Sequence, residues 1–142
     1  RNFTKDNIPA LQKEKYVNMT YSELEKLISD WNTKKYNGVY FEMFAICSDS
    51  IAAGMVSLYQ HTENTVSIGT EVFERFRRQG IGTEGTRLCI LKAKEMGYKY
   101  VSAQVKTDNT ASISMANNLG FSKIGQTVNR KGNRVYNFIL EL

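Results

Sequence analysis

The chain has 142 residues, of which 42% are hydrophobic and 23% charged, and its formal net charge is +5 at pH 7. This composition excludes a disordered chain, and the length predicts one domain, residues 1–142, that buries a core without disulfide staples. The sequence contains neither a run of about 18 apolar residues nor the pattern of a secretory signal, so we expect no membrane segment and a cytoplasmic location.

Cysteine and histidine usage restricts the chemistry. Cys47 lies in an apolar run and Cys89 in a helical pattern, so both are expected to be buried thiols. His61 is the only histidine, and no Cys/His cluster has metal-ligand spacing, so neither a metal site nor a histidine-based triad is expected. Because the chain begins at Arg1 and not at methionine, we expect a leader or part of a first strand to precede it.

The first half of the chain is predicted to form two helices and an antiparallel hairpin. One helix spans about residues 7–16, and the capping box Thr20-Tyr21-Ser22-Glu23 starts the second. Strands follow at residues 40–47 and 51–61, and the turn-forming tripeptide Ser48-Asp49-Ser50 joins them. The apolar face of the second helix consists of Leu24, Leu27, Ile28 and Trp31.

The second half alternates strands and helices. Residues 66–72 alternate as a strand does, and the helix between Gly80 and Gly97 carries apolar residues at helical spacing. These apolar positions are Ile81, Leu88, Leu91 and Met96. The remaining elements are a strand at residues 98–105, a short helix at 110–119, and a hairpin of residues 121–128 and 135–140. This order predicts a mixed sheet with an α/β crossover at its centre.

The segment that joins the strand at residues 66–72 to the next helix is suited to binding an anion. It reads Arg77-Arg78-Gln79-Gly80-Ile81-Gly82-Thr83 and leads into a helix N-terminus. There the first backbone N–H groups lack intrahelical partners and carry the positive end of the helix dipole. Gly80 and Gly82 let a phosphate approach the backbone, and Arg77 and Arg78 add charge. The segment therefore predicts a phosphate or pyrophosphate ligand.

Two other interpretations of this region are weaker. The spacing Gly80-x-Gly82-x-x-Gly85 matches a dinucleotide fingerprint, but charged residues separate the strand from Gly80, and too few residues follow Gly85 for that fold. Residues 73–78 interleave aromatic and cationic side chains, as single-stranded nucleic-acid surfaces do. The basic residues of the chain are nevertheless dispersed and form no stripe, so a nucleic-acid partner is disfavoured.

Two segments resemble motifs of the GNAT N-acetyltransferase superfamily. Residues 77–82 match its hallmark, Arg/Gln-x-x-Gly-x-Gly/Ala, and residues 109–121 resemble a second family segment that ends in Leu-Gly-Phe. The order of the predicted elements is similar to that family over nearly the whole chain. The resemblance implies an α/β, three-layer GNAT-like fold, in which about four helices flank a central mixed, mostly antiparallel sheet of six to seven strands.

The resemblance also implies acetyl-CoA as the donor substrate. Its pyrophosphate would lie on the hallmark segment, and its pantetheine arm would pair as an added strand where residues 66–72 splay from residues 101–105. Asn109 would bond this arm, cap the short helix, or do both. The implied donor-binding residues are Val72, Phe73, Arg77, Arg78, Gln79, Gly80, Ile81, Gly82, Thr83 and Asn109.

The sequence departs from the family at two positions that often transfer protons. Ala116 stands where a general-acid tyrosine is common, and Gln104 where relatives that acetylate protein N-termini often carry a glutamate. The candidate catalytic residues are therefore Glu71, adjacent to Val72, and Ser112 on the short helix. The resemblance implies an acceptor cleft that includes Tyr16, Tyr21, Glu23, Trp31, Glu42 and Tyr136, and such side chains favour an amine.

Three functions stay open at this point. The first is an N-acetyltransferase that transfers acetyl from acetyl-CoA to a primary amine of a small molecule or peptide by direct attack in a ternary complex. The second is a catalytically weak or inactive CoA-binding sensor, which Ala116 and Gln104 favour. The third is a basic nucleic-acid-binding module. Family members commonly form homodimers, and the sequence leaves the oligomeric state open.

Overall fold

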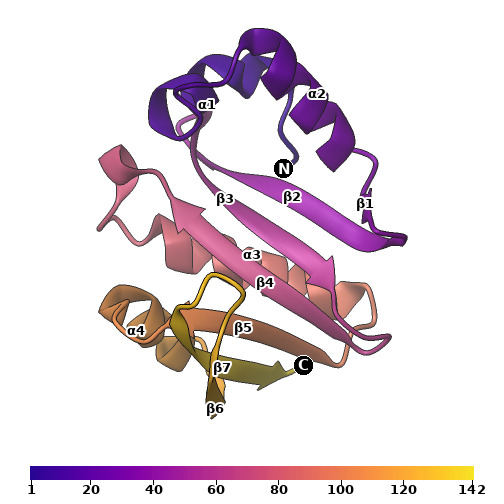
Figure 1. The fold of residues 1–142 in the computed structure, drawn as a ribbon, viewed down its shortest axis with the longest axis vertical. Helices are drawn as coiled ribbons and strands as arrows, with labels where there is room; N and C mark the ends of the chain where they lie inside the picture. Colours follow the sequence, from indigo (N-terminus) through magenta and orange to yellow (C-terminus); the bar gives the residue numbers. More distant parts are fainter.

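The computed structural model describes residues 1–142 as a seven-stranded sheet with helices on both faces (Figure 1). The strands are β1 (Lys35–Tyr36), β2 (Val39–Ser48), β3 (Ile51–Gln60), β4 (Thr65–Val72), β5 (Tyr100–Lys106), β6 (Ser122–Val128) and β7 (Arg134–Glu141). Their order is β1-β2-β3-β4-β5-β7-β6, and only β4 and β5 pair in parallel. The prediction of a mixed, mostly antiparallel sheet is confirmed.

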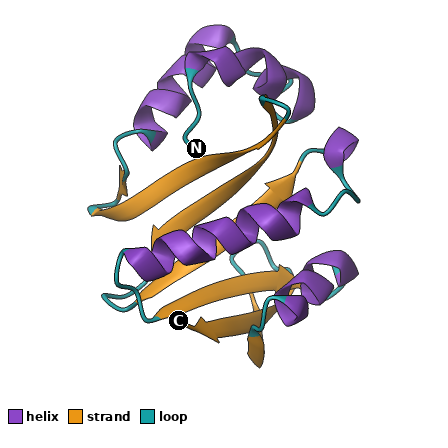
Figure 2. Ribbon diagram, turned by 180° about the vertical axis from the view of Figure 1, so that it is seen from behind, coloured by secondary structure: helices purple, strands orange, loops and turns teal.

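The helices form the two outer layers. They are α1 (Ile8–Glu14), which follows the 3-10 turn Lys5–Asn7, and α2 (Tyr21–Trp31), α3 (Ile81–Glu95) and α4 (Thr110–Asn118). Helices α1 and α2 cover β2 and β3 on one face, whereas α3 and α4 pack on the other face, which Figure 2 shows from the front. None of the four is both long and apolar enough to cross a membrane.

The β2–β3 hairpin forms where the tripeptide predicts it. Asp49 and Ser50 have φ angles of 49° and 68°, as expected for the two central residues of a tight hairpin turn. A register shift between Ile46 and Cys47 interrupts the pairing shortly before this turn. Cys47 is consequently exposed, so the prediction that it is buried is wrong, whereas Cys89 is buried as expected.

Helix α3 meets the sheet through small residues. Its buried residues are Thr86, Cys89 and Ala93, and a Cβ at Gly85 would lie 2.9 Å from the Ile46 side chain. The expected apolar face was wrong, because Leu88, Leu91 and Met96 are 53%, 45% and 42% exposed. The sheet supplies the large side chains at this contact, so the helix has to present small ones to approach it closely.

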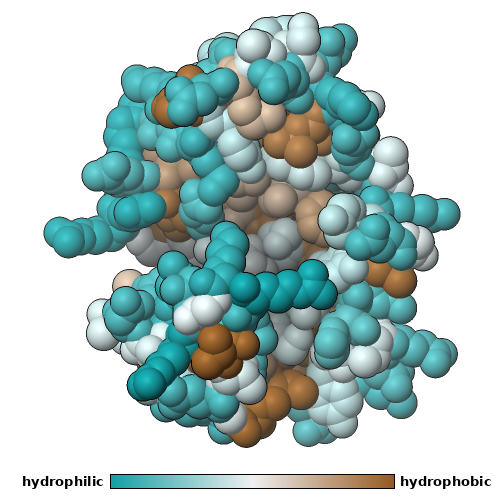
Figure 3. Space-filling model, in the orientation of Figure 1, coloured by the Kyte–Doolittle hydropathy of each residue, from teal (hydrophilic) through white to brown (hydrophobic).

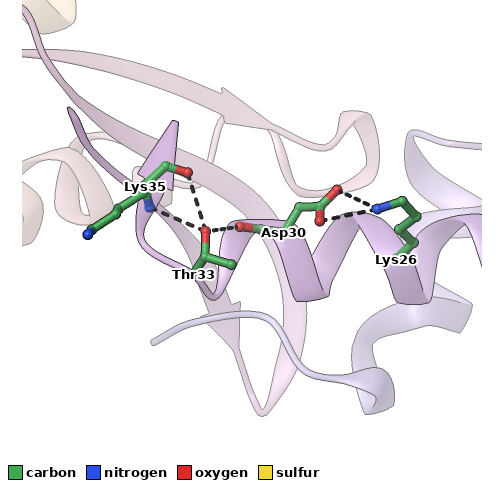
Figure 4. A network of polar contacts seen from close by, with 4 residues as sticks. All are labelled: Lys26, Asp30, Thr33 and Lys35. Atoms are coloured by element: carbon green, nitrogen blue, oxygen red, sulfur yellow. Dashed lines mark hydrogen bonds and ion pairs between the residues drawn. The ribbon is translucent and has the colours of Figure 1, made fainter. Parts of the chain in front are cut away.

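Local polar contacts end α2 and turn the chain toward β1 (Figure 4). Thr20 and Glu23 form the predicted capping box at the start of this helix, and Lys26 and Asp30 form an ion pair near its end. The Thr33 hydroxyl then donates to the Asp30 carbonyl at 2.7 Å and accepts from the Lys35 N–H at 3.4 Å. The Thr33 hydroxyl thus adds a side-chain contact to the backbone hydrogen bonds that the Asp30 carbonyl accepts at the end of the helix.

Candidate active site

Strands β4 and β5 separate at the centre of the sheet. They pair only from Thr65 to Ser67 on β4, opposite Tyr100 to Ser102 on β5. On the other edge of β4, the Phe73 N–H donates to the Ala53 carbonyl at 2.8 Å. Backbone groups point to opposite edges at successive residues of a strand, so Thr70 and Val72 direct theirs toward the gap. The gap therefore presents an unpaired strand edge.

Two adjoining cavities occupy this region. One, of about 600 Å³, lies between β4 and β5, and the other, of about 580 Å³, lies beside the N-terminus of α3. The first is lined from both faces of the sheet, since Ala103 and Val105 face α3 and α4 while Gln104 faces away. The residues that line both cavities are Thr70, Glu71, Arg77, Asn109, Ser112 and Met115.

The N-terminus of α3 has no side-chain cap. Its N-cap residue, Gly80, has a φ of +77°, and a Cβ there would meet nothing within 4 Å. Thr20 and Asn109 cap the N-termini of α2 and α4 through their side chains, whereas α1 and α3 have no side-chain cap. The first N–H groups of α3 have no side-chain partner, an arrangement compatible with binding of an anion.

The first turn of α3 packs directly on the end of β4. A Cβ at Gly82 would lie 2.8 Å from the Val72 Cγ2 atom, so glycine is what permits this contact. The Thr86 hydroxyl lies 2.7 Å from both the Thr70 hydroxyl and the Gly82 carbonyl oxygen. The uncapped helix end and the unpaired strand edge thus meet at one corner of the molecule, and these features fit the pyrophosphate and pantetheine parts of acetyl-CoA.

Arg77, Phe73 and Asn109, which are expected to bind the donor, lie around this corner. They differ in their hydrogen bonds and in their burial. The Arg77 Nε atom donates to the Val72 carbonyl oxygen at 3.0 Å, which occupies part of the strand edge. The Phe73 side chain is buried and its N–H is bonded to β3, so this residue points away from the gap. Asn109 accepts from the Ser112 N–H at 3.1 Å, and so caps α4 while it lines both cavities.

Glu71 faces the α1–α2 side of the sheet, because it lies opposite Met55, which packs in the core beneath α1 and α2. Figure 3 shows this side of the molecule as a space-filling view, in the orientation of Figure 1. Its carboxylate accepts a hydrogen bond from the Lys15 Nζ atom at the end of α1. Burial raises the pKa of the neighbouring Tyr16 phenol, while the Lys15 charge lowers this pKa and the Glu71 charge raises it. The sequence interpretation missed Lys15, because 56 positions separate it from Glu71.

The structure does not bring most residues of the expected acceptor cleft together, so this prediction is largely wrong. Glu23 belongs to the capping box of α2, and Trp31 is buried against Phe3 and Tyr16. Glu42 is buried beneath the opposite face, and Tyr136 packs toward α3 and α4. A polar row that the sequence did not reveal lies beside the gap, where Gln104 donates to Asn137 at 3.0 Å and Asn137 donates to Thr127 at 3.1 Å.

Buried Glu42 leads to a stability prediction. Burial raises its pKa, but hydrogen bonds from Tyr40 and Asn2 and the charges of Lys34 and Lys92 outweigh this effect, so the pKa is lowered. A carboxyl with a lowered pKa in the folded state stabilises the fold above its unfolded pKa and loses this contribution on acidification. Tyr40→Phe removes the 2.6 Å hydrogen bond, so we expect the free energy of unfolding to fall by about 2 kcal/mol at pH 7.

Urea unfolding at neutral and acidic pH tests this prediction. The stability deficit of Tyr40→Phe, which is its loss of unfolding free energy relative to the wild type, should become smaller as the pH falls through the Glu42 pKa. A protonated Glu42 carboxyl no longer accepts the Tyr40 hydrogen bond as a charged group, so the wild type loses this contribution. Tyr98→Phe is the matched control, since the Tyr98 hydroxyl donates to the neutral Gln60 amide at 3.1 Å. Its deficit should not depend on pH over this interval. Equal, pH-independent deficits in the two variants would contradict the assignment.

Comparison with known proteins agrees with this geometry. Residues 3–122 match a family model described as an acetyltransferase (GNAT) domain. A solved structure described as a probable acetyltransferase superposes with a TM-score of 0.87 at 19% identity, covering 99% of this chain and 90% of that chain. A ribosomal-protein α-N-acetyltransferase in complex with coenzyme A gives 0.85 at 17% identity, with coverages of 100% and 92%.

A third structure, an acetyltransferase from Salmonella typhimurium with its cofactor acetyl-CoA, gives a TM-score of 0.77 at 15% identity, covering 100% of this chain and 92% of that chain. At these identities the structures establish the shared fold. The assignment to a family rests on the family model, because this model matches most of the 142 residues. The chain therefore belongs to the GNAT family and is an acetyl-CoA-dependent N-acetyltransferase.

Proposed function

We propose that this acetyltransferase acts on the primary amine of a small molecule or peptide, which attacks the donor directly in a complex that holds both substrates. One observation carries the proposal: the unpaired β4 edge and the uncapped N-terminus of α3 border adjoining cavities that reach the face bearing Glu71. An acetyl donor bound along the first two features would present its thioester to an amine arriving on that face.

The backbone supplies most of the proposed donor site. The N–H groups of residues 80–83 bond the pyrophosphate, with Arg77 and Arg78 adding charge. The pantetheine arm pairs with the β4 edge at Thr70 and Val72, and the Arg77 side chain releases the Val72 carbonyl to permit this. The Val72 N–H donates to the thioester carbonyl and stabilises the negative charge that develops on its oxygen.

The acceptor amine has to lose a proton before it attacks, and the departing thiolate has to gain one. Glu71 is the proposed partner of the amine, since its carboxylate faces the α1–α2 side and lines both cavities. Ser112, which also lines both, is the proposed donor to the thiolate. A peptide α-amine is one candidate acceptor, because the similar α-N-acetyltransferase acts on a ribosomal protein.

Calorimetry combined with a thiol-release assay tests this function. Acetyl-CoA should bind in the micromolar range, and release of free thiol should depend on and saturate with an added amine. The assay panel holds polyamines, lysine derivatives and short peptides with free N-termini. Binding without turnover across this panel would favour the CoA-binding sensor. Salt-sensitive oligonucleotide binding without affinity for acetyl-CoA would favour the nucleic-acid module.

Replacing Ser112 by alanine tests the proton donor. We expect kcat to fall about tenfold to a hundredfold, with the affinity for acetyl-CoA unchanged. The cap of α4 survives, because Asn109 bonds the Ser112 backbone and not its hydroxyl. Ser114→Ala, on the exposed side of the same helix, is the matched control and should retain the wild-type kcat. A wild-type kcat in Ser112→Ala would remove this residue from the mechanism.

Other features stay predictions. These are a single acetyltransferase domain over residues 1–142, a cytoplasmic location and a homodimer.

A further inference from the structure

Two ion pairs fix the end of α1 beside the active site. Lys15 bonds Glu71, and the Arg75 Nε atom donates to the Glu14 carboxylate at 3.0 Å. The Glu14 side chain is 8% exposed and that of Arg75 53%, so only the carboxylate side of the second pair is shielded from solvent. Glu71 directly precedes Val72 in the sequence, and Arg75 follows Val72 by three residues. The Lys15 ammonium is consequently held close to the end of β4 and does not extend freely into solvent.

Lys15 contacts the carboxylate that is proposed to bind the acceptor amine. Glu71 lines both cavities, so the Lys15 Nζ atom lies one hydrogen bond from the wall of the proposed thioester site. The Lys15 side chain is 27% exposed, which leaves its amine partly shielded and partly accessible. Lys15 therefore presents a primary amine to the same Glu71 carboxylate that is proposed to bind the external acceptor.

We propose that Lys15 is an internal acceptor, whose ε-amine this protein acetylates in the same molecule. The inference rests on the proposed function, because it uses the same donor site. After the ammonium loses one proton, the Nζ lone pair forms a bond to the thioester carbonyl carbon, and the carbon–sulfur bond breaks. The second proton lost by the nitrogen balances the proton gained by the departing thiolate, so the products are Nε-acetyl-lysine and coenzyme A.

The modification changes the acceptor site. An acetylated Lys15 has no positive charge, so its ion pair with Glu71 is lost. The Glu71 carboxylate is then free to bind an external amine. Self-acetylation thus removes an internal competitor for the acceptor position.

Intact-mass and peptide mass spectrometry test the inference. The purified protein is incubated with acetyl-CoA, and the acetylation rates of Lys15 and Lys13 are compared in the same digest. Lys13 lies on the same helix and is more exposed, so uncatalysed acetylation would favour it. We expect Lys15 to react at least tenfold faster, with a first-order constant that is independent of protein concentration. Desulfo-coenzyme A, which lacks the thiol, should slow Lys15 and leave Lys13 unchanged.

Three results would overturn the inference: a Lys15 rate no higher than that of Lys13, a rate constant that rises with protein concentration, or insensitivity to desulfo-coenzyme A. Lys15→Arg keeps a cation for Glu71 but has no acylable primary amine, so it should lose the added mass at this peptide. The same samples are assayed for thiol release with external amines. Turnover without Lys15 modification rejects only the inference, whereas absence of both rejects the proposed function as well.

Discussion

Replacing Gly80 by aspartate is expected to lower the affinity for acetyl-CoA at least about a hundredfold, which corresponds to about 2.7 kcal/mol. Gly80 is the N-cap of α3, where no side chain satisfies the first N–H groups. A carboxylate there binds to the same positive helix end and repels the pyrophosphate. A Cβ at Gly80 meets nothing within 4 Å, so aspartate there clashes with no neighbour, although the φ of +77° adds backbone strain that the control variant has to match.

Isothermal titration of acetyl-CoA into this variant provides the measurement. The matched control is Gly38→Asp in the β1–β2 turn, where the φ is +79° and a Cβ also meets nothing within 4 Å. The β1–β2 turn and the start of α3 lie on opposite sides of the molecule in the view of Figure 1. The control has the same change in charge and backbone strain, so it should bind like the wild type. Wild-type affinity in Gly80→Asp would exclude the helix end as the pyrophosphate site.

Replacing Gly54 by alanine is expected to lower the free energy of unfolding by about 3 kcal/mol. A Cβ at this position would lie 2.5 Å from the Glu71 carbonyl oxygen and 3.1 Å from the Val72 Cα atom. Both are backbone atoms of β4, so neither can rotate away. Strand β4 therefore has to move to accommodate the Cβ. This strand also carries the Val72 N–H, which is the proposed donor to the oxyanion. We therefore expect kcat to fall together with stability.

Urea denaturation checks the stability effect. Gly69→Ala is the matched control in the adjacent strand, because its Cβ would meet only the Ser57 side-chain oxygen, at 3.2 Å. A hydroxyl rotates at little cost, so this variant should lose less than about 1 kcal/mol. Equal stabilities of the two alanine variants would contradict the close approach of β3 and β4 at this point.

The sequence features from which the donor site is proposed are local. The anion-binding segment of residues 77–83 combines a strand end, two glycines and a helix start within a few residues. The capping box of α2 and the hairpin at Asp49 and Ser50 are local in the same sense. Such patterns depend on hydrogen bonds between neighbouring residues, which a sequence contains in full.

The acceptor side was decided by the tertiary structure. Glu71 points toward the α1–α2 face because β4 pairs with β3 in one register, which places it opposite Met55, and α1 then brings Lys15 to it. The same strand alternation turns Tyr136 and Glu42 away from this face. The sequence by itself determined the element order and the uncapped start of α3 after β4. Sheet register and helix docking decided which side chains share a face, because a shift of one residue would exchange the two faces of a strand.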